Sequence, residues 1–223
     1  MSLKTQGITK SFGDPPIQII KPMDIHIENG DFVSITGRSG SGKTTLLYLL
    51  SSLDLPTTGT VWIEDNDIRQ MNQIELHKFR CEKIGFIFQF HYLLPELTAL
   101  ENVLLPARAI GIQREKTKEA EELLKKFDVF SERDKLPSKM SGGQQQRVAV
   151  ARSLIMKPRY LFADEPTGNL DSFSSKVVMN FLKEVNEKTG TTIVLVTHDE
   201  AYAKMASRTI FLVDGKIVDE KDY

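Results

Sequence analysis

The sequence predicts an α/β fold into which a helical segment is inserted. Short apolar runs with strand character alternate with segments of helical periodicity, which is typical of α/β proteins. One predicted strand leads directly into a glycine-rich loop and a helix. A long stretch of helical character then interrupts the alternation, which resumes after it. The 223 residues, 40% of them hydrophobic, are enough for one large domain with its own core.

The composition argues against several classes of function. A net charge of −1 at pH 7 lacks the basic excess of a general nucleic-acid binder, so we expect no nucleic-acid partner. The single cysteine, Cys81, rules out an internal disulfide and fits a reducing compartment. No apolar run approaches the ~20 residues that cross a bilayer, and the first residues do not resemble a signal peptide. We therefore expect a soluble, cytosolic chain that needs another polypeptide to form any transport pore.

The first part of the chain contains the strand that leads into the glycine loop. The run Phe32–Thr36 is apolar enough for a buried strand, and residues 44–52, which contain four leucines, predict a helix packed on it. Residues 56–59 have turn chemistry. Further strands are predicted at residues 60–64 and 84–88.

The middle of the chain, residues 98–157, is predicted to be helical. Four apolar residues between 120 and 127 recur at i, i+3, i+4 and i+7, which places them on one helix face, and the charges between them form the solvated face. A further helix is predicted from residue 141 to 154. This stretch interrupts the α/β pattern and therefore reads as a helical insertion.

The α/β pattern resumes after the helical insertion. Strands are predicted at 160–163 and 192–196, with an amphipathic helix around residues 177–185 between them. The segment 210–218 predicts a hairpin closed by the turn Asp214-Gly215. These elements complete the predicted sheet.

Residues 37–44 read Gly-Arg-Ser-Gly-Ser-Gly-Lys-Thr and fit the phosphate-binding pattern G-x-x-x-x-G-K-[ST]. Glycines let the backbone approach phosphates closely, so that N–H groups at the helix N-terminus surround the anion. Lys43 supplies positive charge to the outer phosphates, and the Thr44 hydroxyl can ligate Mg²⁺. Because the loop lies between a predicted strand and a predicted helix, we expect it to bind a nucleoside triphosphate.

Two carboxylates end the predicted strand at 160–163. Asp164 and Glu165 are costly to bury there without a cation or hydrogen-bond donors. Asp164 is the candidate to hold Mg²⁺, and Glu165 is the candidate to polarise the water that attacks the terminal phosphate. The alternative is an acidic strand end before Pro166 with no catalytic role.

Residues 141–147 read Ser-Gly-Gly-Gln-Gln-Gln-Arg. Ser141, followed three residues later by Gln144, is a capping box that starts a helix. Two glycines in the first turn are unfavourable for a helix that only has to start, but they are explained if the backbone contacts a ligand. The Ser141 hydroxyl and the amides of Gly142 and Gly143 would then bind the γ-phosphate of a partner subunit's nucleotide. Capping and binding are compatible.

Two single polar residues also follow predicted strands. His198, after the strand 192–196, could contact the terminal phosphate, although a lone histidine is more often structural. Gln89, after the strand 84–88, could reach Mg²⁺ or water, and by itself it carries little signal.

In order along the chain, these motifs resemble those of the ATP-binding cassette family, and the resemblance covers nearly the whole chain. It implies a P-loop NTPase core of RecA type with an antiparallel β subdomain and an inserted α-helical subdomain. Residues 1–223 would form one cassette, with a core of 1–88 and 158–223 and a helical subdomain of 89–157. The implied ligands are ATP and Mg²⁺, and the implied partner is a second copy of the chain.

The resemblance also implies roles for single residues. Glu165 corresponds to the catalytic carboxylate and His198 to the switch histidine, while Gln89 corresponds to the glutamine that senses the metal and links to the membrane partner. Thr44, Gln89 and Asp164 correspond to the metal-binding residues.

Three further groups follow from the same resemblance. The residues expected to bind ATP are Phe12, which would stack on adenine although tyrosine is commoner there, and Gly37, Arg38, Ser39, Gly40, Ser41, Gly42, Lys43, Thr44 and Thr45. The signature motif that would bind the partner's ATP is Ser141, Gly142, Gly143 and Gln144, preceded by Met140 where leucine is usual. The residues expected at the dimer interface are Asn169, Leu170 and Asp171.

A narrower resemblance comes from residues 89–103, Gln-Phe-His-Tyr-Leu-Leu-Pro-Glu-Leu-Thr-Ala-Leu-Glu-Asn-Val, and from residues 163–172. These segments resemble the lipoprotein-release (Lol-type) and macrolide-exporter group, and the Phe-His-Tyr-Leu-Leu-Pro run is closer to the lipoprotein-release members. The resemblance implies a peripheral ATPase on the cytoplasmic face of the inner membrane, bound to integral membrane subunits at Phe90–Leu97. Phe90 and Tyr92 either line a groove for the partner's coupling helix or fill the local core.

Two other functions stay open from the sequence. One is an ATPase of a macrolide or antimicrobial-peptide exporter, or of a small-solute importer. The other is a soluble cassette protein that acts on ribosomes or DNA. Proteins of the second kind typically carry two cassettes or a long coiled-coil insertion, and this chain shows neither pattern.

Overall fold

The computed structural model describes residues 2–168 and 170–222, which form two compact units. The first unit consists of Met1–Leu76 with Val185–Tyr223, and the second consists of His77–Glu184. The predicted α/β class, with parallel and antiparallel sheets, is confirmed. The predicted subdomain limits at 89–157 stay a prediction.

The first unit begins with a small antiparallel sheet. Its strands follow the order β2 (Ile17–Met23), β1 (Ser2–Phe12), β5 (Thr58–Ile63) and β6 (Asn66–Asp67), and β3 (His26–Glu28) also pairs with β1. Burial alternates along β1 from Leu3 to Gln6, which is typical of a sheet with one solvent-facing side. The sequence analysis predicts only β5 of this sheet.

The second sheet of this unit is mainly parallel. Its strands follow the order β11 (Lys216–Val218), β10 (Arg208–Val213), β4 (Phe32–Thr36) and β9 (Thr192–Val196). β10, β4 and β9 are parallel, and β11 is antiparallel to β10. Every residue of β4 and β9 is buried, as expected for parallel strands covered on both faces. The predicted strands and the predicted closing hairpin are confirmed.

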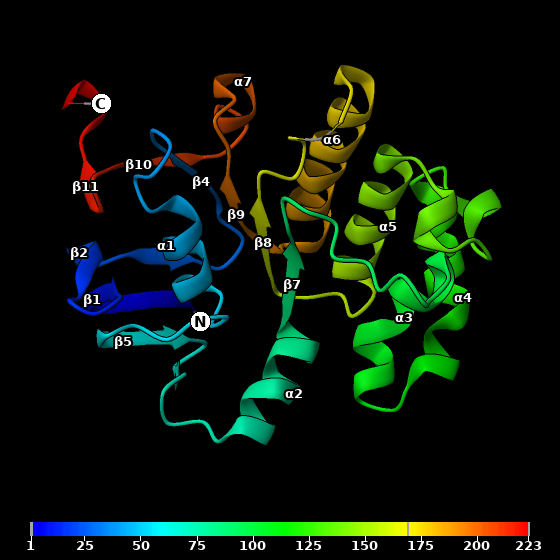
Figure 1. Ribbon diagram of the computed structural model, residues 1–223, viewed down its shortest axis with the longest axis horizontal. Helices are drawn as coiled ribbons and strands as arrows, with labels where there is room; N and C mark the ends of the chain where they lie inside the picture. The colour runs from blue at the N-terminus through cyan, green and yellow to red at the C-terminus, as the bar shows by residue number, and fades with distance from the viewer. Residues whose placement is uncertain (1, 169, 223) are drawn as a thin grey trace. The chain divides into compact units, whose positions relative to one another are not determined.

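Helix α1 (Lys43–Leu50) follows the glycine loop and contacts both sheets of the first unit. It packs against β9 and against β1 and β2 (Figure 1). Its leucines, at 46, 47, 49 and 50, are fully buried. The helix ends earlier than the predicted residue 52, because Ser52 takes a left-handed conformation with φ 61° that cannot continue it.

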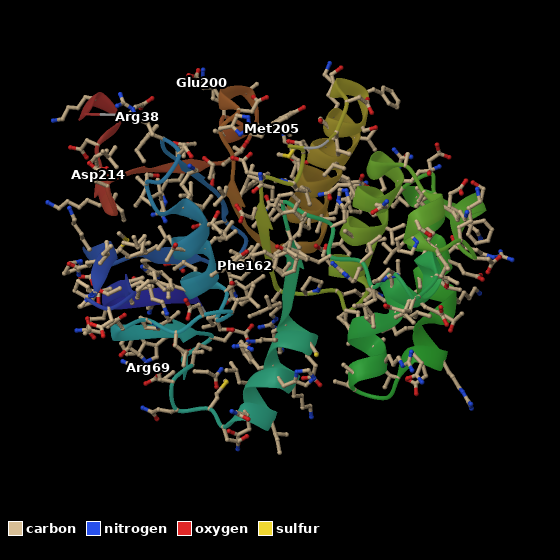
Figure 2. The ribbon with its side chains drawn as sticks, in the orientation of Figure 1. Arg38, Arg69, Phe162, Glu200, Met205 and Asp214 are labelled. Carbon is tan, nitrogen blue, oxygen red and sulfur yellow. The ribbon has the colours of Figure 1, made fainter. Side chains whose placement is uncertain are left out.

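The second unit combines two parallel strands with a cluster of helices. β7 (Ile84–Ile87) pairs with β8 (Tyr160–Asp164), whose five residues are all buried, Phe162 among them (Figure 2). Helices α3 (Ala99–Ala109), α4 (Gln113–Lys126) and α5 (Gly142–Leu154) contact one another, and α5 also contacts β7 (Figure 1). The remaining long helices are α2 (Gln73–Lys83) and α6 (Ser172–Thr189).

The helix predicted around residues 120–127 is confirmed as α4. Ala120, Leu124 and Phe127 are buried, and the ring centroid of Phe127 lies 4.5 Å from that of Phe181 on α6. No helix in the described part of the chain is both long enough and apolar enough to span a membrane.

The sequence analysis does not predict α2, and it includes α3 only as part of the helical stretch 98–157, without bounds of its own. All residues of α2 are described and none is buried, so α2 has no apolar face that periodicity could reveal. α3 contains Pro106, which usually marks a helix end. The helix nevertheless starts at a capping box of Thr98 and Glu101, and buried Val103 and Ala107 hold it in the cluster.

We expect Ile193→Ala in β9 to lower the free energy of unfolding by about 2–5 kcal/mol, because it removes atoms from a fully buried side chain. Ile74→Ala on α2 is the matched control. Ile74 is 82% exposed, so its replacement should change stability by no more than about 0.5 kcal/mol. Urea titration followed by circular dichroism measures both variants, and equal losses would contradict the burial of β9.

Candidate functional site

The loop between β4 and α1 has the backbone geometry of an anion site. A Cβ on Gly37 would lie 2.4 Å from the carbonyl oxygen of Leu212 and 2.6 Å from Ser41 Oγ, so no side chain fits there. Gly40 and Gly42 have φ of 79° and 100°, a region that favours glycine. Packing or backbone conformation within the first unit therefore explains why glycine occupies each of these three positions.

Polar donors gather along this loop. α1 begins at Gly42 without a side-chain cap from any described residue, and an uncapped helix N-terminus attracts anions. Lys43 folds back over the loop, and its Nζ donates to the carbonyl oxygens of Gly37 at 2.9 Å and Arg38 at 3.0 Å. Ser41 Oγ is buried and has no hydrogen-bond partner within residues 2–168 and 170–222. Arg38 is exposed on the loop (Figure 2). The loop can therefore accept a phosphate.

Phe12, the predicted adenine contact, lies at the end of β1 and is 48% exposed. It pairs with the exposed Ile17 of β2. Lys10 Nζ lies 5.0 Å from the centroid of the Phe12 ring and 2.6 Å from Asp54 Oδ1. The strand end thus presents a flat apolar surface suited to a base.

His198 follows β9 and is exposed. Because β4 and β9 are parallel, the chain leaves both at the same edge of the sheet. His198 therefore lines a pocket of about 380 Å³ together with Thr36 and Gly37, where the phosphate loop begins. The first unit thus brings His198 and the start of the phosphate loop to one place.

In the second unit, Asp164 is the last residue of β8, Glu165 follows it, and Gln89 lies two residues after the end of β7. These strands are parallel and Ile87 faces Ala163, so the residues that follow leave the pair at one edge. Asp164 is 3% exposed, Glu165 is half-buried and Gln89 is exposed. A cation or hydrogen-bond donors must offset the cost of burying a charged Asp164.

Glu165 begins a tight turn after β8. Its φ of 46° is uncommon for a glutamate, and such conformations concentrate at functional sites. The Gly168 N–H donates to the Glu165 carbonyl oxygen at 3.1 Å and closes the turn. Asn169, predicted at the dimer interface, lies outside the described residues.

Asp171, also predicted at the dimer interface, caps α6. Its carboxylate accepts hydrogen bonds from the N–H groups of Ser174 and Phe173, each at 2.9 Å, and from Ser174 Oγ at 2.7 Å. These bonds, the Ser174 N–H first among them, lower the pKa of Asp171. The capping function is one that the sequence analysis missed, and the interface function stays a prediction.

Ser141 starts α5 through the predicted capping box. Its Oγ accepts from Gln144 N–H at 3.2 Å, and its own N–H donates to Gln144 Oε1 at 2.8 Å. Apart from its chain neighbours and the backbone of its own helix, a Cβ on Gly142 would first meet His91 Nε2 at 4.0 Å, and one on Gly143 would first meet Leu170 Cδ2 at 3.7 Å. Neither glycine has a positive φ. Nothing within the described chain therefore requires glycine at these two positions.

We call Phe90–Leu97 the docking segment. Phe90 and Tyr92 are each 61% exposed and Leu94 is 45% exposed, so the alternative that these aromatics fill the local core is wrong. Their rings contact each other at a centroid distance of 6.3 Å. The segment thus presents apolar side chains to the outside.

Two polar residues hold the backbone of the docking segment from inside. Asn102 on α3 is fully buried, accepts from Leu94 N–H at 2.8 Å and donates to the Leu94 carbonyl oxygen at 3.1 Å. Arg152 on α5 donates to the carbonyl oxygens of His91 at 2.8 Å and Tyr92 at 2.7 Å. Burial lowers the pKa of Arg152 to about 10, which still leaves it charged at neutral pH.

Asn102, Arg152 and the buried Gln146 are site residues that the sequence analysis missed. A signal for one of them was present. Gln146 lies four residues before Val150 and so shares the buried face of α5, and a polar side chain on such a face needs partners.

Each unit contains an oxygen donor that a metal could use. The described residues contain no group of three or more His, Cys, Asp or Glu able to hold a metal. The Thr44 hydroxyl in the first unit and the Asp164 carboxylate in the second are oxygen donors of the kind that Mg²⁺ prefers. Mg²⁺ commonly completes its shell with phosphate oxygens and water, so each of these donors, taken by itself, fits a metal that arrives with a nucleotide.

Comparison with known proteins shows which family the chain resembles. The family model described as ABC transporter matches residues 20–168. The chain is 54% identical to the lipoprotein-releasing system ATP-binding protein LolD of Leptospira interrogans, over 99% of this chain and 92% of that protein. It is 48% identical to the protein of the same name from Aquifex aeolicus, over 91% of each.

Solved structures show the same fold. The dimeric structure of MJ0796, described as a bacterial ABC transporter cassette, is 42% identical, with a TM-score of 0.91 over 97% of each chain. A dimeric post-hydrolysis state of the same cassette, bound to ADP and Pi, is 40% identical, with a TM-score of 0.89 over 97% of each chain.

We expect Gly142→Ala to raise the free energy of unfolding by about 0.4–1 kcal/mol, because the new methyl group enters open space in a helix. Gly37→Ala is the matched comparison and should destabilise, since its Cβ would overlap a backbone carbonyl. Scanning calorimetry separates the two. Equal destabilisation would show that packing within the chain requires both glycines.

Proposed function

The chain belongs to the ABC transporter family, and we propose that it is the ATPase that drives release of lipoproteins from the inner membrane. Identity of 54% over 99% of the chain with a lipoprotein-releasing system protein supports this cargo. The proposed location is the cytoplasmic face of that membrane, where the chain binds peripherally to integral subunits.

ATP is the proposed ligand of the loop between β4 and α1. The N-terminus of α1 and the Lys43 ammonium bind the outer phosphates, and Phe12 stacks on the adenine. Thr44, Asp164 and Gln89 are the proposed residues for Mg²⁺. When bound, the metal supplies charge neutralisation at the transferred phosphoryl group.

Glu165 is the proposed catalytic carboxylate. It orients and polarises the water that attacks the γ-phosphorus, while His198 contacts the γ-phosphate oxygens. The bond from the water oxygen to phosphorus forms as one proton of that water passes to the Glu165 carboxylate, the bond from phosphorus to the β–γ bridging oxygen breaks, and ADP and phosphate leave. The left-handed φ of 46° at Glu165 supports this role, because such strain persists where a side chain has to be aimed.

The signature motif Ser141–Gln144, which we call the signature loop, is proposed to bind the ATP of a second copy of the chain. The observation that carries this proposal is the open space around Gly142, whose Cβ would first meet His91 Nε2 at 4.0 Å, apart from its chain neighbours and its own helix backbone. Glycine is not needed there for the chain itself, whereas a phosphate from a partner needs a bare backbone with N–H donors. The related MJ0796 cassette is dimeric. Leu170, Asp171 and Asn169 are the proposed contacts between the two copies.

The docking segment is proposed to receive a helix of a membrane subunit. Its exposed Phe90, Tyr92 and Leu94 provide an apolar surface of the kind that receives a partner helix. Because Asn102 and Arg152 already hold the backbone, little ordering cost opposes binding.

Glu165→Gln is expected to retain ATP binding and to lower ATP hydrolysis by at least about 100-fold, because an amide cannot act as a base for the attacking water. Glu115→Gln, the same change on an exposed position of α4, is the control and should hydrolyse ATP at the wild-type rate. Phosphate release and nucleotide binding are measured for both variants. Hydrolysis by Glu165→Gln at a normal rate would sink the catalytic assignment.

The Glu165→Gln chain, captured with ATP from native membranes, is expected to bring a membrane subunit with a large extracytoplasmic domain. Adding Phe90→Asp should reduce the recovery of that subunit by about tenfold, because a charge enters an apolar contact. Phe173→Asp, on a residue 77% exposed on α6, is the control.

Mass spectrometry identifies what is captured with the chain. A bound lipoprotein supports lipoprotein release, and a macrolide or peptide efflux subunit selects the exporter alternative. Recovery of ribosomal or DNA-bound proteins alone would overturn the transport assignment.

A further inference from the structure

Gln146 is a buried glutamine that links two segments of the second unit. It lies on α5 and is 1% exposed. A buried amide must find its partners within the protein, and the partners of Gln146 lie outside its own helix. Its Nε2 donates to the Pro166 carbonyl oxygen at 2.7 Å, and its Oε1 is hydrogen-bonded to His91 Nδ1.

These two contacts determine the tautomer of His91. The Pro166 carbonyl can only accept, so the nitrogen of the Gln146 amide faces it and the oxygen faces His91. The amide oxygen also only accepts, so His91 Nδ1 carries the hydrogen. Nε2 of a neutral His91 is then an acceptor. A neutral histidine in water mostly carries its hydrogen on Nε2 instead.

The two hydrogen bonds of Gln146 reach two segments that have roles in the proposed function. Pro166 follows Glu165, so its carbonyl belongs to the turn that carries the proposed catalytic group. His91 belongs to the docking segment, and Arg152 of α5 holds its carbonyl oxygen at 2.8 Å. The imidazole also lies beside the signature loop, with Nε2 4.0 Å from where a Cβ on Gly142 would be.

We infer that His91 is a positioning residue that couples the docking segment to the turn carrying Glu165, with Gln146 as the link. This inference rests on the proposed function of those two segments. His91 is half-buried and belongs to the docking segment, whereas Gln146 is closed off from solvent. Gln146 cannot replace a lost partner with bulk water, so a shift of the imidazole moves the amide or the backbone at Pro166.

The tautomer of His91 is measured first, on the purified chain. Long-range ¹H–¹⁵N spectra of the imidazoles are simple to assign, because the sequence has four histidines and His91→Phe removes one signal. We expect the Nδ1–H form for His91 and its loss in Gln146→Leu, which lacks the acceptor. An Nε2–H form in the wild-type chain overturns the inference.

The second measurement is kcat and KM for ATP, in complexes purified from native membranes through a tag on this chain. His91→Phe keeps a ring and removes both nitrogens, and it should lower kcat by about tenfold with KM changed less than about twofold. Gln146→Leu should lower kcat by a similar factor, again with little change in KM. The double variant should be no slower than either single variant, because both interrupt the same chain of bonds.

His91→Asn is the conservative variant, since its amide nitrogen can take the place of Nδ1 as a donor. It should recover most of the rate lost in His91→Phe. Effects that multiply in the double variant, a change confined to KM, or no rescue by asparagine each overturn the inference. If Gln146→Leu does not fold, the wild-type tautomer and the two His91 variants decide.

If the proposed ATPase function is wrong, the measurements give a different result from the one expected if only the His91 inference is wrong. Wild-type complexes that hydrolyse no ATP, or a Glu165→Gln variant that hydrolyses it normally, contradict the ATPase roles. The tautomer measurement does not depend on hydrolysis, so it still tests the link from His91 to Gln146.

Discussion

The close approach of the phosphate loop to β10 is the constraint on which the nucleotide site of the first unit depends. Gly37 passes so near the Leu212 carbonyl that no side chain fits between them. The loop rests on β4, every residue of which is buried, and continues into α1, whose leucines are buried as well. A backbone held at both ends presents its N–H groups without reorganisation, which is what strong binding of a phosphate needs.

In the second unit, helix α5 is the element that connects the proposed functional segments. It starts at the signature glycines, and its buried side carries Gln146 and, near its end, the partly buried Arg152. Each of these residues bonds to backbone outside the helix: the turn that contains Glu165 and Pro166 for Gln146, and the docking segment for Arg152. A helix is stiff along its axis, so one element relates the signature loop to both segments. Substitution of these residues by apolar ones would preserve packing and remove that relation.

Three polar residues of the second unit that are buried or partly buried belong to, or hold, the segments used by the proposed function. Asp164 is 3% exposed at the end of β8, and Asn102 is fully buried under the docking segment. Arg152 remains charged although burial lowers its pKa to about 10. Buried polar groups are costly unless their partners are well placed, and a fully satisfied network makes one conformation much more stable than its alternatives. The docking segment is therefore held in place before any partner binds.

Local sequence patterns predicted much of the fold and most of the candidate site. β4 and β9 are apolar throughout, and the capping box at Ser141 lies within four residues, so short-range rules suffice for them. α2 escaped prediction because it buries nothing, and the bounds of α3 escaped it because Pro106 masks a helix that tertiary packing stabilises. The curated relatives and the solved cassettes agree with the fold and family that these patterns indicated.

The sequence by itself determined where the phosphate loop, the carboxylates and the signature glycines lie along the chain. Only the tertiary structure decided what each of them touches. Gly37 and Gly142 look alike in the sequence, but a distant strand crowds the first and nothing in the described chain crowds the second. Gln146 reads as an ordinary helix residue, yet its partners are 20 and 55 residues away. Contacts over such separations leave no trace in local periodicity, because they depend on how the whole chain packs.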